Sequence, residues 1–374
     1  MRVLIFHNYL DTIGGGEKLV LTLARELGAD VVTTNLDEGI VRQMGFTCDN
    51  IISLGDTLTI PPLKQIHTSL KFLMCDFSRK YDFFIFSGEW SVFAAKRHTP
   101  NLLYCHTPPR HFYDLYDVFL SRLGFFRRLL FRLWVCIHRP LTEHFIGHVD
   151  KLVSNSKNTR ERVKKYYRRD SDVIYPFADC SRYHYVKAGD YWLSVNRFYP
   201  EKRIKLQTEV FRRLPEKKLI IVGGFARGDH ADAYRKGVIE DLPENVFLLG
   251  RVSEDRLRQL YGECEAFITT SLDEDFGMTP LEAMASGKPV VAVKEGGYLE
   301  TVVDGVTGRL VDADINSLLR VVREVSANPL KYRVACEQQA ARFDLALFVE
   351  KMRSAIGIAG AASTSLEGPD DILS

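Results

Sequence analysis

The chain has 374 residues, a formal net charge of +2 and 26% charged residues. A single hydrophobic core rarely serves a chain of this length, so two domains are expected. The near-neutral charge gives no electrostatic reason to expect nucleic-acid binding. Seven cysteines are scattered along the chain without a Cys-x-x-Cys pair. This pattern argues against a disulfide framework or a zinc site and indicates a reducing compartment such as the cytoplasm.

Targeting segments are not expected from the sequence. The apolar run that follows Arg2 has only the length of a strand, which is too short for a signal peptide. No stretch of about 18 uninterrupted apolar residues is present, so no transmembrane helix is predicted.

Short runs rich in β-branched and aromatic residues alternate with helix-length stretches throughout the chain. The alternation predicts an α/β protein with parallel sheets covered on both faces, in two doubly wound domains. The predicted domains are 1–180 and 188–340, with a hinge at 176–190, a C-terminal helix at 341–358 and a disordered tail at 359–374. The predicted strands are Val3–His7, Val31–Thr34, Phe83–Phe86, Leu102–His106, Leu152–Asn155, Val173–Tyr175, Trp192–Val195, Leu219–Val222, Val246–Leu249, Ala266–Thr270, Val290–Val293 and Gly308–Val311.

A glycine-rich turn follows the first predicted strand. It reads Gly14-Gly15-Gly16-Glu17 and precedes an amphipathic helix, so its backbone can approach an anion at a helix N-terminus. It lacks the G-x-G-x-x-G pattern of dinucleotide-binding folds. Gly15 and Gly16 therefore either contact a phosphate or form only a turn.

Residues 118–141 combine arginines with large apolar side chains and contain no acid. At about 3.6 residues per turn, Arg128, Arg132 and Arg139 share one stripe, with Arg127 beside it. The apolar residues Phe126, Leu130, Leu133, Trp134 and Ile137 spread over the rest of the helix. This composition favours an interfacial helix on an anionic membrane, which would make the protein peripheral on its cytoplasmic face. The alternative is a helix half buried against the first domain, with arginines that reach water or pair with acids elsewhere.

The densest motif spans residues 271–292. After the predicted strand Ala266–Thr270, an acidic loop leads to a helix with Thr279 as predicted N-cap and Pro280 as first helical residue. Glu274 and Glu282 lie on either side of this helix start. The arrangement suits two carboxylates that bind hydroxyl groups on either side of free helix-start amides. The alternative is a well-capped helix with solvated acids.

This motif resembles that of the family-4 glycosyltransferases, and the resemblance extends over nearly the whole chain. The family has the GT-B fold, in which two Rossmann-like domains face each other and the active site lies in the cleft between them. The resemblance implies that Glu274 contacts the donor sugar and Glu282 the ribose. It also assigns the contacts with the sugar and diphosphate to the backbone amides of Phe276, Gly277, Met278 and Thr279.

Further positions match the family pattern in the second predicted domain. The resemblance places Arg197 and Lys202 on the donor diphosphate, and Arg251 and Val252 where the base is bound. Asn196 departs from the pattern, because the family often has glycine before the arginine. The run Glu295-Gly-Gly-Tyr-Leu-Glu300 resembles another family loop, in which Glu300 is expected to order the site.

In the first predicted domain, His106 ends a strand and is followed by a Thr-Pro-Pro loop. A lone histidine is more often structural, but the family has a histidine here beside the donor sugar, which implies a catalytic role for His106 together with Glu274. Arg110 and His111 are weaker candidates for binding an acceptor phosphate. His7 and Trp90 are interpreted only as core or cleft-lining residues.

The resemblance implies transfer of a hexose with retention of anomeric configuration. No metal or other cofactor is expected, because protein cations neutralise the leaving diphosphate. Asp273-x-Asp275 can also be interpreted as a metal-binding motif, but the two predicted sheets and the cationic site argue against it. The motif wording is most like mannosyltransferases of surface-glycan and O-antigen type. This suggests GDP-mannose as donor and a glycan or polyprenyl-linked acceptor. The alternatives are a sugar-nucleotide epimerase of the same fold and a non-catalytic subunit of a glycan assembly complex.

Overall fold

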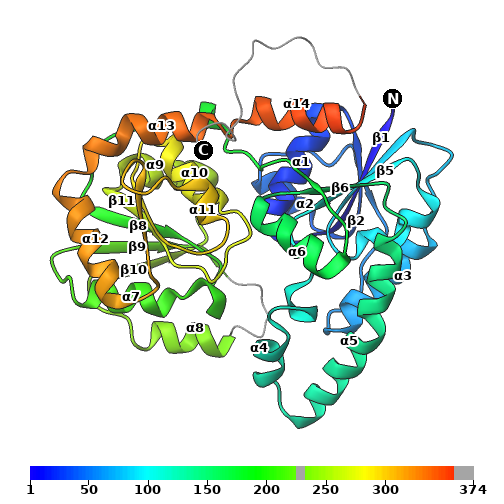
Figure 1. Ribbon diagram of the computed structural model, residues 1–374, viewed down its shortest axis with the longest axis horizontal. Helices are drawn as coiled ribbons and strands as arrows, with labels where there is room; N and C mark the ends of the chain where they lie inside the picture. Colours follow the sequence, from blue (N-terminus) through cyan, green and yellow to red (C-terminus); the bar gives the residue numbers. More distant parts are fainter. Residues whose placement is uncertain (225–231, 358–374) are drawn as a thin grey trace. The chain divides into compact units, whose positions relative to one another are not determined.

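The computed structural model describes residues 1–224 and 232–357. It divides into two compact units: unit 1 holds Met1–Tyr175 with the described residues from Val349 onward, and unit 2 holds Pro176–Phe348. The boundary falls at the start of the predicted hinge 176–190. Each unit is a parallel sheet with helices packed against it (Figure 1). The predicted tail 359–374 and residue 358 lie outside the described residues.

The sheet of unit 1 has the order β3-β2-β1-β4-β5-β6-β7, with all pairs parallel. The strand order reverses between β1 and β4, where doubly wound sheets bind ligands beyond the carboxyl ends of their strands. His7 of β1 and Ser87 of β4 are register partners at this edge. The strands are β1 (Val3–Leu10), β2 (Asp30–Leu36), β3 (Ile51–Ser53), β4 (Phe83–Ser87), β5 (Asn101–Cys105), β6 (Lys151–Ser154) and β7 (Asp172–Val173).

The helices of unit 1 surround this sheet, and all but α4 contain buried residues. In α1, for example, Leu19, Val20 and Leu23 are buried, and the helix ends at Gly28, whose φ of 60° suits glycine. The helices are α1 (Gly15–Leu27), α2 (Glu38–Gln43), α3 (Leu63–Met74), η1 (Ser91–Arg97), η2 (Arg110–Phe112), α4 (Tyr116–Ser121), α5 (Phe125–Ile146) and α6 (Lys157–Tyr167).

Unit 2 repeats this plan with the parallel strand order β10-β9-β8-β11-β12-β13. Its order reverses between β8 and β11, so residues that follow these two strands are placed at the equivalent switch point. The strands are β8 (Tyr191–Val195), β9 (Lys218–Val222), β10 (Val246–Gly250), β11 (Ala266–Thr269), β12 (Val290–Val293) and β13 (Gly308–Val311).

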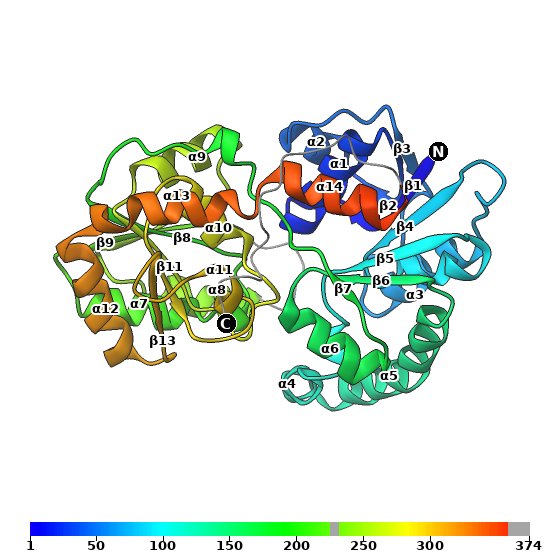
Figure 2. The same ribbon diagram turned by 45° about the horizontal axis from the view of Figure 1, so that its top comes forward.

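The helices of unit 2 connect these strands, and the last helix leaves the unit. α14 begins in unit 2, but from Val349 onward it clusters with unit 1. There Arg353 donates to the Glu26 carbonyl at 2.8 Å, and α14 lies beside α1 in both ribbon views (Figures 1 and 2). The helices are η3 (Cys180–Arg182), η4 (Pro200–Lys202), α7 (Ile204–Arg212), α8 (Asp232–Ile239), α9 (Glu254–Glu263), α10 (Met278–Ala285), α11 (Tyr298–Thr301), α12 (Ile315–Ala327), η5 (Pro329–Tyr332), α13 (Arg333–Ala341) and α14 (Leu345–Ala355).

The structure confirms the predicted α/β class with two Rossmann-like sheets. One strand, β3, was not predicted, because it has three residues and none of them is fully buried. The stretch 118–141 is not one helix, as its periodicity was interpreted, but parts of α4 and α5. Gly124 starts α5, and Arg128 donates to the carbonyl groups of Leu120 and Leu123, which stabilises the turn between the two helices.

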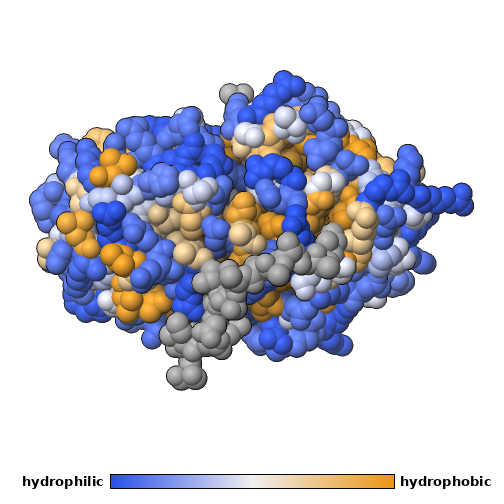
Figure 3. All heavy atoms as spheres, turned by 90° about the horizontal axis from the view of Figure 1, so that it is seen from above, coloured by the Kyte–Doolittle hydropathy of each residue, from blue (hydrophilic) through white to orange (hydrophobic). Residues whose placement is uncertain are grey.

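No helix in the described part of the chain is long and apolar enough to cross a membrane. Figure 3 views the molecule from above and shows apolar side chains among hydrophilic ones on this face. Such scattered apolar residues are normal on protein surfaces. α5 differs, because its exposed apolar residues follow one another along a single helix.

Candidate active site

The motif loop of unit 2, Leu272–Gly277, connects β11 to α10. Gly277 has a φ of 94°, a left-handed conformation that favours glycine, and α10 begins directly after it. The prediction of Thr279 as N-cap and Pro280 as first helical residue is therefore wrong, because the turn at Gly277 starts the helix earlier and both residues lie inside it. No side-chain hydrogen bond caps this helix start, which suits an anionic ligand.

A second loop, Glu295–Gly297, packs directly on the motif loop. The amide of Gly297 donates to the Glu274 carbonyl at 2.7 Å. A Cβ atom at Gly296 would collide with that carbonyl, and one at Gly297 would collide with the backbone of Phe276. These two glycines therefore permit the close approach that holds the motif loop in place.

Glu274 is fixed by charge and by hydrogen bonds. Its Oε2 accepts from Lys202 Nζ at 2.6 Å and from Tyr298 Oη at 3.4 Å, and Tyr298 also hydrogen-bonds Thr269 at 2.6 Å. Burial by itself raises the pKa of Glu274, but the charge and hydrogen bond of Lys202, together with other hydrogen bonds such as that of Tyr298, hold the pKa below its usual value. Glu274 is therefore an ionised carboxylate in a set position.

A second ion pair lies beside the first and was not predicted. Arg203 Nη1 is 2.7 Å from Glu295 Oε1, and Glu295 Oε2 accepts from the Asp273 amide at 3.1 Å. Glu295 thus makes ordering contacts with the motif loop, and the same role predicted for Glu300 of α11 stays a prediction. The sequence could have indicated this pair only by position, because Arg203 adjoins Lys202 and Glu295 precedes the two glycines.

Glu282 lies on α10 and accepts a hydrogen bond from Tyr261 Oη at 2.7 Å. The charge of Glu282 also acts on the nearby Tyr183. Burial, with the charge of Glu282, raises the pKa of both tyrosines well above the usual value, so both remain protonated donors. The buried Tyr261 hydroxyl therefore helps to hold the Glu282 carboxylate in one orientation.

The remaining predicted cations also follow strands of this sheet. Arg197 follows β8 and is exposed, and Arg251 follows β10. The Arg251 side chain lies against Gly224, where an added Cβ atom would be 2.8 Å from Arg251 Cγ. Val252 comes next and is half-buried. Asn196, at the position where the family often has glycine, is buried and donates to Ser194 Oγ at 2.6 Å.

In unit 1, His106 lies at the carboxyl end of β5 with two polar neighbours from other strands. His106 Nε2 and Ser87 Oγ are 2.8 Å apart, and His7 Nδ1 donates to the Ser87 carbonyl at 2.8 Å. Burial lowers the pKa of His106 to about 3, and the neighbouring His7 adds to this effect. His106 is thus a neutral imidazole near pH 7, able to hydrogen-bond a sugar hydroxyl but not to act as a cationic acid.

The same edge carries Asn8 and Glu89, which the sequence analysis did not single out. Asn8 Oδ1 accepts from the amides of Trp90 and Ser91 at 3.1 and 3.0 Å, and its Nδ2 donates to Glu89 Oε2 at 3.2 Å. Burial raises the pKa of Glu89, and its hydrogen bonds offset this only in part. Only their positions could have indicated them, because Asn8 lies near the carboxyl end of β1 and Glu89 shortly after β4, beside the switch point.

The predicted glycine turn lies at this edge as well. Gly14 precedes α1 without a side-chain cap, and Gly15 is the first residue of the helix. A Cβ atom at Gly16 would be 3.7 Å from His106 Cε1, so the turn and the histidine are neighbours. Unit 1 therefore brings together Gly16 and His106, as unit 2 brings together Lys202 and Glu274.

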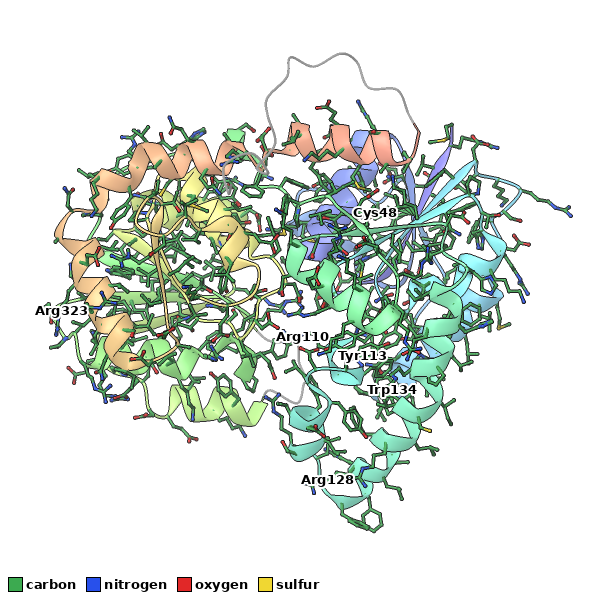
Figure 4. All side chains as sticks on the ribbon, in the orientation of Figure 1. Cys48, Arg110, Tyr113, Arg128, Trp134 and Arg323 are labelled. Carbon is green, nitrogen blue, oxygen red and sulfur yellow. The ribbon has the colours of Figure 1, made fainter. Side chains whose placement is uncertain are left out.

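Arg110 and His111, the weaker candidates for an acceptor phosphate, both contact other residues of unit 1, and the phosphate role stays a prediction. Arg110 forms a two-armed ion pair with Asp114, at 2.8 and 2.6 Å, which already satisfies much of its charge. The His111 ring stacks on Trp134 with centroids 5.3 Å apart. Figure 4 shows Arg110 and Trp134 in this part of unit 1, near α5. Both predicted residues are thus engaged in structural contacts.

No metal-binding cluster is evident in the described ranges, which contain no group of three or more His, Cys, Asp or Glu residues placed to hold an ion. Asp273 and Asp275 lie in the motif loop, where Glu295 accepts from the Asp273 amide. Metal independence of the reaction stays a prediction.

Comparison with known proteins identifies the family of unit 2. Residues 186–343 match the family model for glycosyl transferases group 1. This range contains the donor-site residues predicted in the second domain, whereas Gly15, Gly16 and His106 lie outside it. In the described part of unit 2, the family motif therefore coincides with the edge that carries the two ion pairs.

Curated relatives are similar over part of their length. The α-1,3/1,6-mannosyltransferase ALG2 of Dictyostelium discoideum is 26% identical over 298 residues, which covers 67% of this chain and 68% of that protein. Human ALG2 is 29% identical over 253 residues, covering 59% and 58%. A D-inositol 3-phosphate glycosyltransferase of Mycobacterium sp. (strain JLS) is 26% identical over 224 residues, covering 54% and 50%.

Solved structures are similar over nearly the whole chain. Anabaena HepE in complex with UDP and glucose has a TM-score of 0.75 at 19% identity, covering 96% of this chain and 99% of that one. Sucrose-phosphate synthase from Thermosynechococcus elongatus has a TM-score of 0.73 at 16% identity, covering 95% and 98%. These similarities confirm the predicted GT-B fold. Residues 186–343 thus match the glycosyl transferases group 1 family, and the mannosyltransferase relatives support a hexosyltransferase activity.

Proposed function

We propose that the chain is a retaining mannosyltransferase that moves mannose from GDP-mannose to a glycan or lipid-linked acceptor. The observation that carries the proposal is the pair of fixed carboxylates, Glu274 and Glu282, on either side of the uncapped start of α10, with Lys202 beside the first. The names of the ALG2 relatives support mannose as the sugar.

Unit 2 supplies the groups that a nucleotide diphosphate-sugar requires. Arg197 and Lys202 bind the diphosphate, because an ammonium group has three donors and Lys202 can contact a phosphate while it holds Glu274. The helix-start amides of Phe276–Thr279 meet the diphosphate and sugar. Glu274 accepts from sugar hydroxyls and Glu282 from the ribose. The nucleobase is bound beside Arg251 and Val252.

Unit 1 supplies a neutral imidazole, backbone amides and one carboxylate with its carboxamide partner. Neutral His106 hydrogen-bonds the donor sugar, and the amides of Gly15 and Gly16 face the phosphates. Glu89 and Asn8 bind hydroxyl groups of the acceptor, because a carboxylate with a carboxamide partner suits a sugar diol. These polar groups lie on the same edge as the switch point of the sheet.

The chemical step is a displacement on one face of the sugar. The acceptor oxygen forms its bond to the anomeric carbon on the face from which the diphosphate leaves, so the configuration is retained. The bond between the anomeric carbon and the phosphate oxygen breaks, and the acceptor proton passes to a diphosphate oxygen. Lys202, Arg197 and the α10 amides stabilise the charge on the leaving diphosphate, so the reaction requires no metal and no other cofactor.

A lipid-linked acceptor would place the enzyme at the cytoplasmic face of a membrane, where nucleotide sugars are available to it. The absence of a described membrane-spanning helix is compatible with peripheral attachment.

The test is turnover with a panel of nucleotide sugars. Purified protein should release GDP from GDP-mannose in the presence of a mannosyl acceptor, and NMR of the product should show an α linkage. Glu274→Gln provides the inactive control. Release of GDP that does not depend on acceptor, or faster turnover of a UDP-sugar, would contradict the donor and acceptor assignment. A free epimerised nucleotide sugar would indicate an epimerase, and donor binding without turnover would indicate a non-catalytic subunit.

A further inference from the structure

The helix α5 has two apolar faces, and only one of them is covered. Phe131, Trp134 and Val135 are buried in an aromatic cluster with Trp90 and Phe112. His138 lies on the same inner face and hydrogen-bonds Ser69 of α3 at 3.1 Å. This face anchors α5 to unit 1. Trp134, which the sequence analysis grouped with the apolar residues outside the arginine stripe, lies on this covered face and is 9% exposed.

The opposite side of α5, called the outer face here, exposes seven large apolar side chains. Their relative exposure runs from 43% to 78%, which is unusual for so many neighbouring apolar residues. Positions 126, 130, 133, 137 and 141 recur at intervals of three or four, so they form one stripe along the helix. The members are Phe125, Phe126, Leu129, Leu130, Leu133, Ile137 and Leu141.

The arginines of α5 divide into two groups. Arg128 donates to three carbonyl groups at the end of α4, and Arg139 pairs with Glu143 at 3.4 Å and lies over the Tyr113 ring. The predicted stripe of three arginines is thus largely structural. Arg127 and Arg132 are exposed at other positions on the same helix. No acid occurs between residues 118 and 142, so the charged side chains that α5 itself contributes along the outer face are arginines.

We propose that the outer face of α5 inserts into the interfacial layer of an anionic lipid bilayer, with Arg127 and Arg132 among the phosphate groups. An apolar stripe with flanking arginines is the composition that binds at membrane interfaces. The proposal deepens the proposed function and rests on it for the lipid-linked acceptor, because it places unit 1, with Glu89 and His106, against the surface that carries such an acceptor.

Charge favours a lipid surface over a second copy of the chain. A two-fold contact through the outer face would bring Arg127 and Arg132 of both copies together with no carboxylate from residues 118–142 to neutralise them. Anionic lipid headgroups supply the missing negative charge and accept the apolar side chains at the same time. The α4–α5 hairpin projects from the rest of unit 1, which leaves its tip near Arg128 accessible (Figures 1 and 4).

The experiment is co-sedimentation of the full chain with phosphatidylcholine vesicles that contain either no phosphatidylglycerol or an equal part of it. Wild-type protein should bind the anionic vesicles and bind the neutral ones at least tenfold more weakly. The variant Phe126→Ser, Leu130→Ser, Ile137→Ser should lose at least tenfold in binding to anionic vesicles. Its matched control, Leu330→Ser, Val334→Ser, changes exposed apolar residues of unit 2 and should bind as wild type does.

A second pair of variants tests the charge. Arg127→Glu, Arg132→Glu should weaken binding to anionic vesicles, whereas Arg320→Glu, Arg323→Glu on α12 changes the net charge equally and should not (Figure 4). Wild-type protein that binds neither vesicle, or an outer-face variant that binds as well as wild type, overturns the proposal. So does a dimer that the outer-face substitutions dissociate.

Vesicle binding is measured without donor or acceptor, so it does not depend on the proposed reaction. Activity on a water-soluble acceptor should persist in the outer-face variant, which shows that the protein is folded. Vesicle binding by a protein that turns over no GDP-mannose would refute the proposed function and leave the membrane proposal standing.

Discussion

The carboxyl edges of the two sheets have the same strand order around the switch point but carry different groups. In unit 2 the edge contains two short ion pairs, Lys202–Glu274 and Arg203–Glu295. In unit 1 the corresponding edge contains His106, Ser87 and His7 in neutral hydrogen bonds. Doubly wound sheets thus provide the position of a site, whereas the residues after each strand decide its chemistry.

The difference between the two edges matches the ligand group that each edge is proposed to bind. A leaving diphosphate gains negative charge in the transition state, so preorganised cations and amides stabilise it most where they are already held in place. The carboxylates of Glu274 and Glu295 hold Lys202 and Arg203 before any ligand arrives. Sugar hydroxyls are uncharged, and a neutral imidazole such as His106 can hydrogen-bond them without an unpaired charge being buried.

The largest effect is expected when the charged edge loses Lys202. Lys202→Ala removes a diphosphate contact and leaves Glu274 without its cation. The loss of transition-state stabilisation should be about 2–4 kcal/mol, which lowers kcat/KM roughly 30- to 1000-fold. Lys217→Ala is the matched control. It breaks a similar pair with Glu265, at 2.8 Å, at the amino edge of the same sheet. Near-normal kcat/KM in folded Lys202→Ala protein would remove the donor-site assignment.

The next prediction separates the two carboxylates within the charged edge. Glu282→Gln should weaken binding of free GDP by roughly 10- to 100-fold, the range of about 1.5–3 kcal/mol for a hydrogen bond to a charged group. Glu274→Gln should leave GDP affinity near that of wild type and reduce turnover, because its partner is the sugar. Calorimetric titration with GDP measures both. Equal loss of GDP affinity in the two variants would contradict the division between ribose and sugar.

A smaller effect tests the neutral character of unit 1. The pKa of His106 is about 3 in the folded protein and about 6.5 when unfolded, so between these values the unfolded chain binds more protons. The titration of His106 therefore lowers the free energy of unfolding as the pH falls below about 6.5.

Thermal unfolding at pH 7.5 and pH 5.0 measures this contribution. The drop in Tm between the two pH values should be smaller in His106→Gln than in wild type, by roughly 2–4 °C for each kcal/mol that the histidine contributes. His7 and His138 also have lowered pKa values because they are buried, so part of the wild-type drop should remain in the variant. An unchanged drop would mean that His106 is protonated in the folded state, and the contrast between the two edges would fail.

Sequence patterns predicted the two sheets well because buried parallel strands are apolar throughout and each is followed by a helix. The strand ends fixed where Glu274, His106 and Arg197 would lie. The pairing partners were not predictable in the same way. Arg203 contacts Glu295 across 92 residues, and such a contact depends on how loops fold over the edge.

Two errors have local physical causes. Thr279-Pro280 has the composition of a helix start, but the left-handed φ of Gly277 starts α10 before it. On α5, residue periodicity located the helical faces but not which of them packs inward. Trp134 and Phe131 were thus indistinguishable by type from the exposed Phe126 until the contacts of the helix were known.

The smallest expected effect is that of metal removal. It tests whether the charged edge of unit 2 is sufficient to neutralise the leaving diphosphate. If Lys202, Arg197 and the α10 amides neutralise the diphosphate, an excess of chelator should leave kcat/KM unchanged, and added Mg²⁺ or Mn²⁺ should not raise it. The competing hypothesis is that Asp273 and Asp275 hold a divalent ion on the diphosphate. The substitutions Asp273→Asn, Asp275→Asn separate the two. If activity is lost in chelator and returns with Mn²⁺ in wild type but not in this variant, the metal hypothesis is right and the protein cations are insufficient. If the variant and the wild type are equally indifferent to chelator, the charge of unit 2 itself performs the role that a metal has in other diphosphate sites.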